Sequence, residues 1–269
     1  MSQFNGISGH SAQDAVLSIV HDVKATWNHN RTPTLLTFDI TGYFNFIPHH
    51  YLIDTLRRFY IPLQTTKWVY SFVKDREASI CLDGKKDSLK PYRSGIPQGS
   101  CMSLILVAYF TAPMGNEVNI NMIMKLAHIP ELSTTIETGR AHINLLTLYV
   151  DDSSIVASVP NQETGSKLVK IAFSMTHEWL ATCGLKVDQV KSELIHFTKS
   201  NQGKNAGQGP PVTIPTNSLG ISKMIEPSKM VKYLGVWLNS CHNFIEHVQK
   251  STTKAIMAAH SLRLLGNSI

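Results

Sequence analysis

The chain has 269 residues, 43% of them hydrophobic, and is long enough to bury a sizeable core in one large domain or two small ones. Its 25 basic and 19 acidic residues give a formal net charge of +6, which suits a polyanionic partner without establishing one. The cysteines (81, 101, 183 and 241) lack C-x-x-C spacing, which disfavours a zinc site or disulfide framework and favours a reducing intracellular compartment, nucleus or cytoplasm, with no targeting signal visible.

The first predicted elements are a helix and a strand. Ser11 and Asp14 form a capping box at the start of a helix that continues to about residue 27. Residues 34–40 then form an apolar strand in which successive side chains face opposite ways. Asp39 is the one charged residue of that strand. An isolated carboxylate in such a setting is a candidate functional group.

Helices are predicted over about 49–60 and again from Pro62, and Asp83-Gly84 is typical of a hairpin turn. The segment 95–100, Gly-Ile-Pro-Gln-Gly-Ser, then opens a long apolar helix. Its glycines allow a nucleic-acid backbone to come close, Gln98 offers a donor and an acceptor, and Ser100 is a good N-cap.

The apolar helix after Ser100 is expected to be interrupted at Pro113 and Gly115. No unbroken apolar stretch of membrane-spanning length and no signal peptide is visible in the sequence. We therefore expect no membrane partner.

The tetrapeptide Tyr149-Val150-Asp151-Asp152 ends one apolar strand and precedes another, which predicts a hairpin with two carboxylates at its tip. If this strand lies beside residues 34–40, Asp39 and Asp151 come together. Carboxylates hold Mg²⁺, and paired ions ~4 Å apart serve phosphoryl transfer in polymerases and nucleases. Taken alone, Asp-Asp at a tight turn is more often ordinary turn chemistry.

A helix over about 162–182, stopped by Gly184, and a strand over 194–197 complete this part of the chain. Ignoring insertions, the order is β-α-β-β-α-β, an α+β fold of split-βαβ (ferredoxin-like) type. Residues 199–229 are rich in Gly, Pro, Ser and Asn and indicate a loop or inserted linker. A short strand over 231–238 follows. The last predicted helix, 244–265, has possible packing positions at Phe244, Val248, Ile256, Ala259 and Leu262.

Five motifs in this order resemble those of reverse transcriptases, and their spelling is closest to the non-LTR (LINE-like) retrotransposons. The matching stretches are residues 38–44 (motif A), 95–100 (motif B), 149–152 (motif C), 184–187 with 191–193 (motif D) and 232–236 (motif E, the primer grip). Retroviral and LTR-type enzymes usually have Leu-Pro-Gln-Gly in motif B, which is why the non-LTR branch is favoured here.

The resemblance implies an RNA-directed DNA polymerase that adds deoxynucleotides from their triphosphates to a DNA primer on an RNA template. It implies partial fingers at 1–33 and a palm at 34–198 that includes a fingers-type hairpin near 76–93. A linker at 199–229, a primer-grip strand at 230–240 and the start of a helical thumb at 241–269 would follow. Because the family's fingers begin further upstream, we expect this chain alone to bind nucleic acid but to extend a primer poorly.

The resemblance also assigns the site residues. Two Mg²⁺ ions, with Mn²⁺ as an alternative, would be held by Asp39, Asp151 and Asp152. Lys191 would donate a proton to the pyrophosphate leaving group or neutralise it. Phe44 would be a steric gate against a ribose 2′-hydroxyl. The substrate would also be contacted by Gln98, Gly99 and Tyr149. The primer would be held by Tyr233, Leu234 and Gly235.

Each role has a structural alternative. Phe44 could be a core aromatic, Gln98 could cap a turn, Lys191 could be a solvated lysine, and Asp152 could serve only the hairpin turn. The chain also departs from the family pattern, with no loss of a proposed metal ligand, at Thr41, Asn45, Cys101 and Leu104. Such departures fit a decaying element copy.

The alternative function is therefore a truncated or degenerate nucleic-acid-binding fragment without polymerase activity. A plain split-βαβ structural domain is a third interpretation, which the intact order of the motifs disfavours. Telomerase, group II intron and retron enzymes share the same chemistry, so the motifs leave the element type open.

Overall fold

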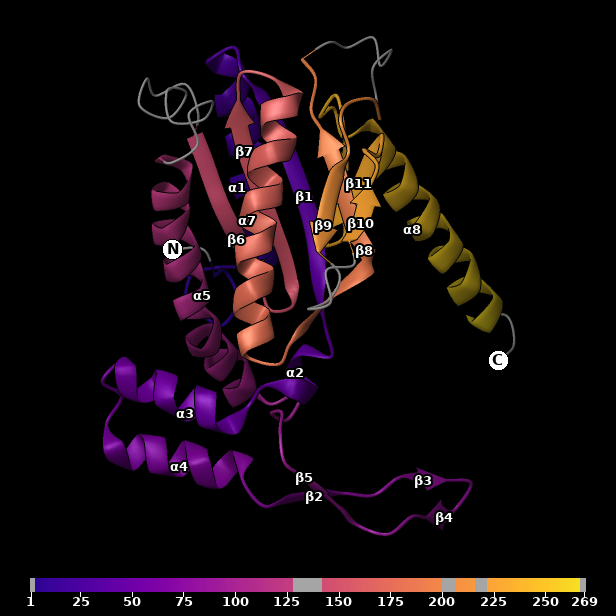
Figure 1. Ribbon diagram of the computed structural model, residues 1–269. Helices are drawn as coiled ribbons and strands as arrows, with labels where there is room; N and C mark the ends of the chain where they lie inside the picture. The colour runs from indigo at the N-terminus through magenta and orange to yellow at the C-terminus, as the bar shows by residue number, and fades with distance from the viewer. Residues whose placement is uncertain (1–2, 128–141, 200–206, 216–221, 267–269) are drawn as a thin grey trace.

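The computed structural model describes residues 3–127, 142–199, 207–215 and 222–266. At its centre is a four-stranded sheet of order β6-β7-β1-β8 (Figure 1). All three neighbouring pairs are antiparallel. The strands are β1 (Thr32–Thr41), β6 (His142–Tyr149), β7 (Asp152–Val159) and β8 (Lys186–His196).

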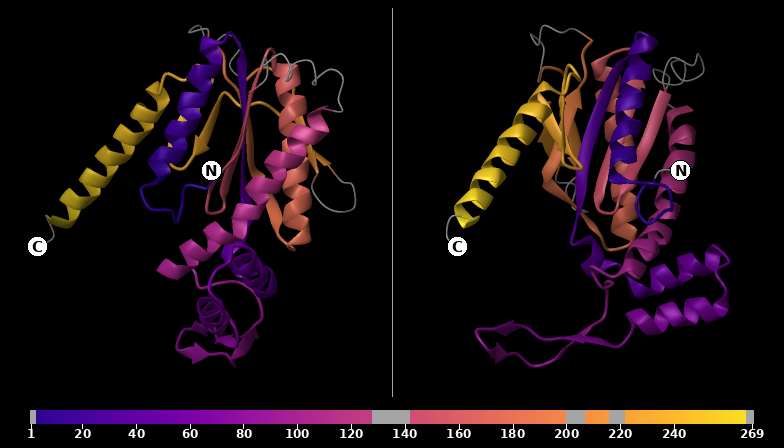
Figure 2. Two further views of the ribbon diagram at one scale, coloured as in Figure 1. Left: turned by 90° about the vertical axis from the view of Figure 1, so that its left-hand side faces the viewer. Right: turned by 180° about the vertical axis from the view of Figure 1, so that it is seen from behind.

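Helices cover both faces of this sheet. Helix α1 (Ala12–Asn28) lies on one face, and α5 (Cys101–Ala127) and α7 (Gln162–Thr182) lie on the other, as the two views of Figure 2 show. Strand β1 supplies side chains to both layers: Phe38 packs with α7 in the larger core cluster, whereas Leu35 packs with α1 in the smaller one. The alternation predicted for this strand is therefore confirmed.

Local capping signals fix the helix boundaries. Ser11 and Asp14 form both hydrogen bonds of the predicted capping box at the start of α1. The Asn161 side chain accepts a hydrogen bond from the Thr164 amide at 2.9 Å and so starts α7. This helix ends just before Gly184, whose φ is +72°. The predicted helix over 162–182 is thus confirmed.

Helix α5 differs from its prediction. Pro113 lies inside a continuous helix, so the expected interruption there is wrong. Phe110 and Met114, on either side of the proline, are fully buried, and we attribute the continuity to their burial, which offsets the hydrogen bond that proline cannot make. Among the described residues, none of the helices is long and apolar enough to cross a membrane.

Three short helices and a long hairpin lie at the end of the sheet where β1 finishes (Figure 1). Asp83 and Gly84, at the tip of the hairpin, both have positive φ as a type I′ turn requires, which confirms the predicted turn. The elements are α2 (Tyr43–Phe46), α3 (His49–Arg58), α4 (Leu63–Val73), β2 (Arg76–Ala78), β3 (Cys81–Leu82), β4 (Lys85–Lys86) and β5 (Lys90–Tyr92).

The C-terminal part contains two further strand pairs and a helix. They are β9 (Val212–Pro215) with β10 (Ser222–Ile225), β11 (Met230–Tyr233) with β12 (Val236–Asn239), and α8 (Ile245–Gly266). The prediction of a loop over 199–229 is wrong where β9 and β10 lie. Val212, Ile214 and Ile225 are buried in the larger core cluster, so this pair is part of the packed structure.

Helix α8 extends away from the rest of the molecule (Figure 2). Its Val248, Ile256 and Leu262 are exposed, so the packing positions predicted for them are wrong within this chain. Helical periodicity indicates which residues share a face, but it does not show that a neighbour covers that face.

Candidate active site

The register of the sheet brings the predicted acids together. Asp39 of β1 is the direct partner of Asp152 at the start of β7, and the Ile40 amide donates to the Asp151 carbonyl at 3.3 Å. On the opposite edge of β7, Asp152 also pairs with Tyr149 at the end of β6. The prediction that the strand ending in Asp151 lies beside residues 34–40 is wrong, because β7 separates β6 from β1. The acids still meet, since the return strand β7 begins at Asp152 and pairs it directly with Asp39.

The turn that carries Asp151 has an unusual backbone. Between the paired residues Tyr149 and Asp152 only two residues remain, and Val150 has φ of +60° while Asp151 keeps a negative value. This is the pattern of a type II′ turn, which favours glycine at its first position. A β-branched residue there is strained. The Val150 side chain is only 9% exposed, and its burial in the core helps to hold this conformation.

A bulge in β8 carries Lys191 to the acids. The register between β1 and β8 passes from Thr37 opposite Glu193 to Asp39 opposite Asp188, so residues 189–192 face a single residue of β1. Such bulges are frequent beside active sites because they redirect a side chain. The Asp188 carboxylate accepts from the Val190 amide at 3.0 Å and shapes the bulge.

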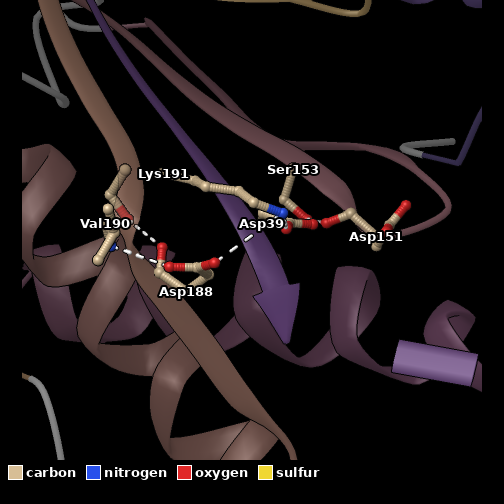
Figure 3. A network of polar contacts seen from close by, with 7 residues as sticks. Asp39, Asp151, Ser153, Asp188, Val190 and Lys191 are labelled. Carbon is tan, nitrogen blue, oxygen red and sulfur yellow. Dashed lines mark hydrogen bonds and ion pairs between the residues drawn. The ribbon is translucent and has the colours of Figure 1, made fainter. Parts of the chain in front are cut away.

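From this bulge the Lys191 ammonium reaches back over β1 and donates a hydrogen bond to the Asp39 carboxylate (Figure 3). It also lies 3.9 Å from the Asp188 carboxylate. Hydrogen bonding to Asp39 raises the pKa of Lys191, so its side chain stays protonated. The three charged groups form the network drawn in Figure 3.

A pocket of about 370 Å³ opens beside this network. Tyr233 and Val236 pair across a two-residue turn, and positive φ at both Leu234 and Gly235 makes that turn type I′. The Lys232 amide donates to the Glu193 carboxylate at 3.1 Å, which ties the turn to β8. The predicted residues that line the pocket together are Asp39, Asp152, Lys191, Tyr233, Leu234 and Gly235.

The electrostatics of the pocket favour a bound cation. Burial, followed by the charges of Asp151 and Asp39, raises the pKa of Asp152 to about 6. Burial also raises the pKa of Asp151. Carboxylates that are partly desolvated and repel one another are stabilised when a positive ion joins them.

The residues fit a divalent metal in chemistry but are not arranged around one. Carboxylate oxygens are what Mg²⁺ prefers. Yet within the described part of the chain, no three acidic, histidine or cysteine side chains converge as a ready ligand set. Figure 3 shows the Lys191 ammonium beside Asp39 while the Asp151 side chain points away from it. A metal would therefore require the acid side chains to reorient and Lys191 to leave Asp39.

The remaining predicted residues lie outside this pocket. Phe44 is half-buried against the larger core, with its ring centroid 6.1 Å from that of Tyr43. Tyr149 is likewise half-buried against the core. Gln98 and Gly99 are exposed in the loop before α5, where Gly99 has φ of +89°. The structure therefore does not gather all the predicted substrate residues around the acids.

Gly95 fastens that loop to α2. Its amide donates to the Ile47 carbonyl at 2.8 Å, and its carbonyl accepts a hydrogen bond from His49 Nε2 at 2.7 Å. A Cβ on Gly95 would lie 2.6 Å from the Phe44 carbonyl oxygen, and φ is +80°. Glycine is therefore required for this close approach.

Sequence reasoning missed three residues that line or shape the site. Glu193 and Lys232 line the pocket and hold its two sides together, and Asp188 shapes the bulge. Glu193 and Lys232 lie inside motifs D and E, so their positions were visible as part of a motif. Their mutual hydrogen bond depends on the fold, and the sequence carries no local signal for it.

The fold and the acid-bearing hairpin define a protein of the nucleic-acid polymerase class. The sequence profile of the family described as reverse transcriptase (RNA-dependent DNA polymerase) matches residues 1–238. The chain belongs to this family.

Curated relatives narrow the assignment. The RNA-directed DNA polymerase from mobile element jockey of Drosophila melanogaster is 22% identical over 210 residues, which cover 78% of this chain and 20% of that protein. The probable RNA-directed DNA polymerase from transposon BS of the same species is 22% identical over 265 residues, covering 98% and 26%. The chain thus spans about a fifth to a quarter of these relatives. The resemblance to reverse transcriptase domains of non-LTR retrotransposons is confirmed.

Among solved structures, apo telomerase from Candida tropicalis truncated from its C-terminal domain is similar in fold. It has a TM-score of 0.54 at 16% sequence identity, with 90% of this chain and 40% of that chain covered. At this identity the likeness extends to the fold alone.

Proposed function

We propose that this chain carries the polymerising core of a non-LTR retrotransposon reverse transcriptase, which adds deoxynucleotides to a DNA primer on an RNA template. The observation that carries the proposal is the pairing of Asp39 with Asp152 beside Lys191, in a pocket closed by the turn at Leu234 and Gly235. Motifs far apart in the sequence thus meet at one place with the charges that phosphoryl transfer needs.

The division of the chain that we propose differs from the expected one in one respect, because α3 and α4, which lie within the expected palm at 34–198, are placed in the fingers. The sheet with its order β6-β7-β1-β8 and crossing helices α5 and α7 would be a palm of split-βαβ type. Helices α3 and α4 with the hairpin of β2 to β5 would belong to the fingers, and α8 would begin the thumb. The turn between β11 and β12 would be the primer grip.

The metal would be held by Asp39, Asp151 and Asp152. Two Mg²⁺ ions, or Mn²⁺ in their place, would supply Lewis-acid stabilisation of the charge that develops during phosphoryl transfer. Lys191 stays protonated beside these acids and can move its ammonium to the pyrophosphate that leaves. Its position on a bulge, with the side chain mostly exposed, gives it room to do so.

The other residues would position the strands and the nucleotide. Leu234 and Gly235 form the tip of the turn and would contact the primer, whereas Tyr233 is 2% exposed and would hold the turn in place. Phe44 would limit space beside the sugar, and Gln98 and Gly99, in an exposed loop, would contact template or nucleotide.

The alternative is a chain that binds nucleic acid but cannot polymerise. The contact of Lys191 with Asp39, where a metal ligand is needed, favours this alternative. Primer extension on an RNA template with Mg²⁺ separates the two, with binding of the same primer-template measured on the same preparation. Extension by the chain supports the polymerase. Because this chain alone is expected to extend poorly, binding without extension supports the alternative when a chain lengthened upstream by the family's fingers also fails to extend the primer.

The matched variants are Asp39→Asn and Asp151→Asn, with Asp54→Asn as the control because Asp54 is an exposed acid of α3. Loss of a metal ligand should lower extension by about 1000-fold or more, since the transition-state charge loses its main stabiliser. Binding should persist. Extension by either site variant at the rate of the control would reject the metal-ligand assignment.

A further inference from the structure

The outer edge of β8 is covered by the part of the chain that contains β9 and β10. Strand β8 is the last strand in the order β6-β7-β1-β8, so this edge has no strand partner within that sheet. The Ser228 amide donates to the Leu194 carbonyl at 2.7 Å, and His196 Nε2 lies 3.0 Å from the Pro210 carbonyl oxygen. Covering an edge in this way satisfies its free backbone groups. The position of β8 therefore depends on this neighbour as well as on β1.

Strand β10 places one side chain on the bulge of β8. Lys223 Nζ donates a hydrogen bond to the Gln189 carbonyl at 2.9 Å. Lys223 pairs with Ile214 of β9, and Ile225 lies two residues further along the same face. Both isoleucines are buried, whereas Met224, on the opposite face, is 58% exposed. The stem of Lys223 thus starts on the face of the strand pair that packs against the protein.

The bulge is closed by contacts of two kinds. Two lie within it: the Asp188 carboxylate accepts from the Val190 amide at 3.0 Å (Figure 3), and the Ser192 hydroxyl donates to the Asp188 carbonyl at 3.1 Å. The contact from Lys223 comes from another element. Residues of a bulge lose regular ladder partners, so their carbonyls need other donors, and a charged donor makes the stronger bond. Lys223 thereby joins the bulge to a buried strand pair.

Packing does little to hold the bulge in place. Val190, at its crest, is 86% exposed, so burial of this side chain contributes little and hydrogen bonds carry more of the burden. Gln189 and Lys191 are only two residues apart, so a shift of the Gln189 carbonyl moves the backbone that carries Lys191. The hydrogen bond between Lys191 and Asp39 consequently depends on the shape of the bulge.

We propose that Lys223 is a positioning residue. Its hydrogen bond to the Gln189 carbonyl fixes the bulge, and the fixed bulge keeps the Lys191 ammonium on Asp39. Lys223 acts through Lys191 and does not touch the reacting atoms. This inference rests on the proposed function, since Asp39 and Lys191 belong to that site, and it gives the pair of β9 and β10 a part in the activity.

The test is a double-mutant cycle on Mn²⁺ affinity, measured by electron paramagnetic resonance on the full chain without primer or nucleotides. Lys223→Met removes the donor and keeps the apolar stem. Because Lys191 then leaves Asp39 more readily, Mn²⁺ should bind about twofold or more tightly. In the Lys191→Gln background the same substitution should change the affinity little. A general effect of lost charge would instead act alike in both backgrounds.

Two further variants serve as controls. Lys223→Arg keeps a charged donor and should restore the wild-type Mn²⁺ affinity. Lys229→Met removes a charge from an exposed position of the same part of the chain, outside the pocket beside Asp39, and its effect should be the same with or without Lys191→Gln. Equal gains from Lys223→Met in both backgrounds, or no gain in either, would overturn the proposal.

Amide hydrogen exchange tests the hold on the bulge without a metal. Peptides that cover residues 186–194 should exchange faster in Lys223→Met than in wild type or Lys223→Arg, because the bulge opens more often. Unchanged exchange would also overturn the proposal, and thermal melting shows whether each variant folds. Mn²⁺ binding that Asp39→Asn leaves unchanged would reject the proposed metal site, and hydrogen exchange then decides on Lys223 alone. The two proposals therefore fail by different measurements.

Discussion

Lys191 and Asp39 lie on strands that are neighbours in the sheet, and the bulge in β8 lets the lysine donate to the aspartate. The contact places a positive charge on the very carboxylate for which a divalent ion would compete. Lys191 thus places its ammonium on the Asp39 carboxylate where a metal ion would bind. Its removal should have opposite effects on metal binding and on catalysis.

Lys191→Gln should therefore bind Mn²⁺ more tightly than wild type in the absence of substrate, by a few-fold, since no ammonium competes for Asp39. Electron paramagnetic resonance of free Mn²⁺ measures this directly. In primer extension the same variant should be slower, by about 10²-fold if the lysine is the proton donor. The control is Lys254→Gln on exposed α8. Weaker Mn²⁺ binding in Lys191→Gln would contradict the competition.

Stability should depend on pH through Asp152. Burial raises its pKa from the ordinary value of 3.8 to about 6 in the folded chain, so between these values the folded state binds more protons than the unfolded state. Stability without metal should then fall as the pH rises from about 4 to 6. Asp152→Asn should flatten this slope and raise stability at pH 7 by about 1 kcal/mol, a value reduced for solvent screening.

Thermal melting of wild type and Asp152→Asn at pH 5 and pH 7 measures the effect. Added Mg²⁺ should stabilise the wild type more than the variant at pH 7. A variant that is less stable than wild type at pH 7 without metal would show that burial and neighbouring charge do not dominate at this carboxyl.

Phe44→Val should relax sugar selection if the aromatic ring limits space beside the ribose. Incorporation of ribonucleotides relative to deoxynucleotides should rise, with a loss of discrimination of about 1–3 kcal/mol. Single-nucleotide kinetics with both substrates provide the measurement. Phe46→Val is a matched control, because Phe46 lies on the same short helix and is exposed. An unchanged ratio with normal deoxynucleotide kinetics would leave Phe44 as a core aromatic.

The two glycines of motif B should respond differently to alanine. At Gly99, nothing lies within 4 Å of the added Cβ, so Gly99→Ala should cost only the backbone strain of φ +89°, about 1 kcal/mol. At Gly95 the Cβ would also meet the Phe44 and Asn45 carbonyl oxygens at 2.6 and 2.5 Å. Gly95→Ala should therefore cost about 3 kcal/mol or more. Chemical denaturation compares the two, and equal losses would contradict the close approach.

Local signals in the sequence determined much of the fold. The capping box at Ser11, the helix that ends before Gly184 and the turn at Asp83-Gly84 each depend on residues a few positions apart. The acids of motifs A and C were recognisable for a related reason, because each is a charge at the end of an apolar strand. Such patterns involve residues of a single helix, strand or turn, so they can be recognised without knowing what that element packs against.

Tertiary structure decided what local patterns could not. The register of β8 brings Lys191 to Asp39 through a bulge, and the sequence of β8 carries no local signal for that bulge. Part of the Gly- and Pro-rich segment forms β9 and β10 because its apolar side chains are buried in the core. Helix α5 continues through Pro113 for the same reason, whereas α8 has no neighbour that covers its exposed side chains among the described residues. Each outcome depends on which distant surface is available to pack against. The free energy gained by that burial outweighs local propensity, and it cannot be read from the sequence of one element alone.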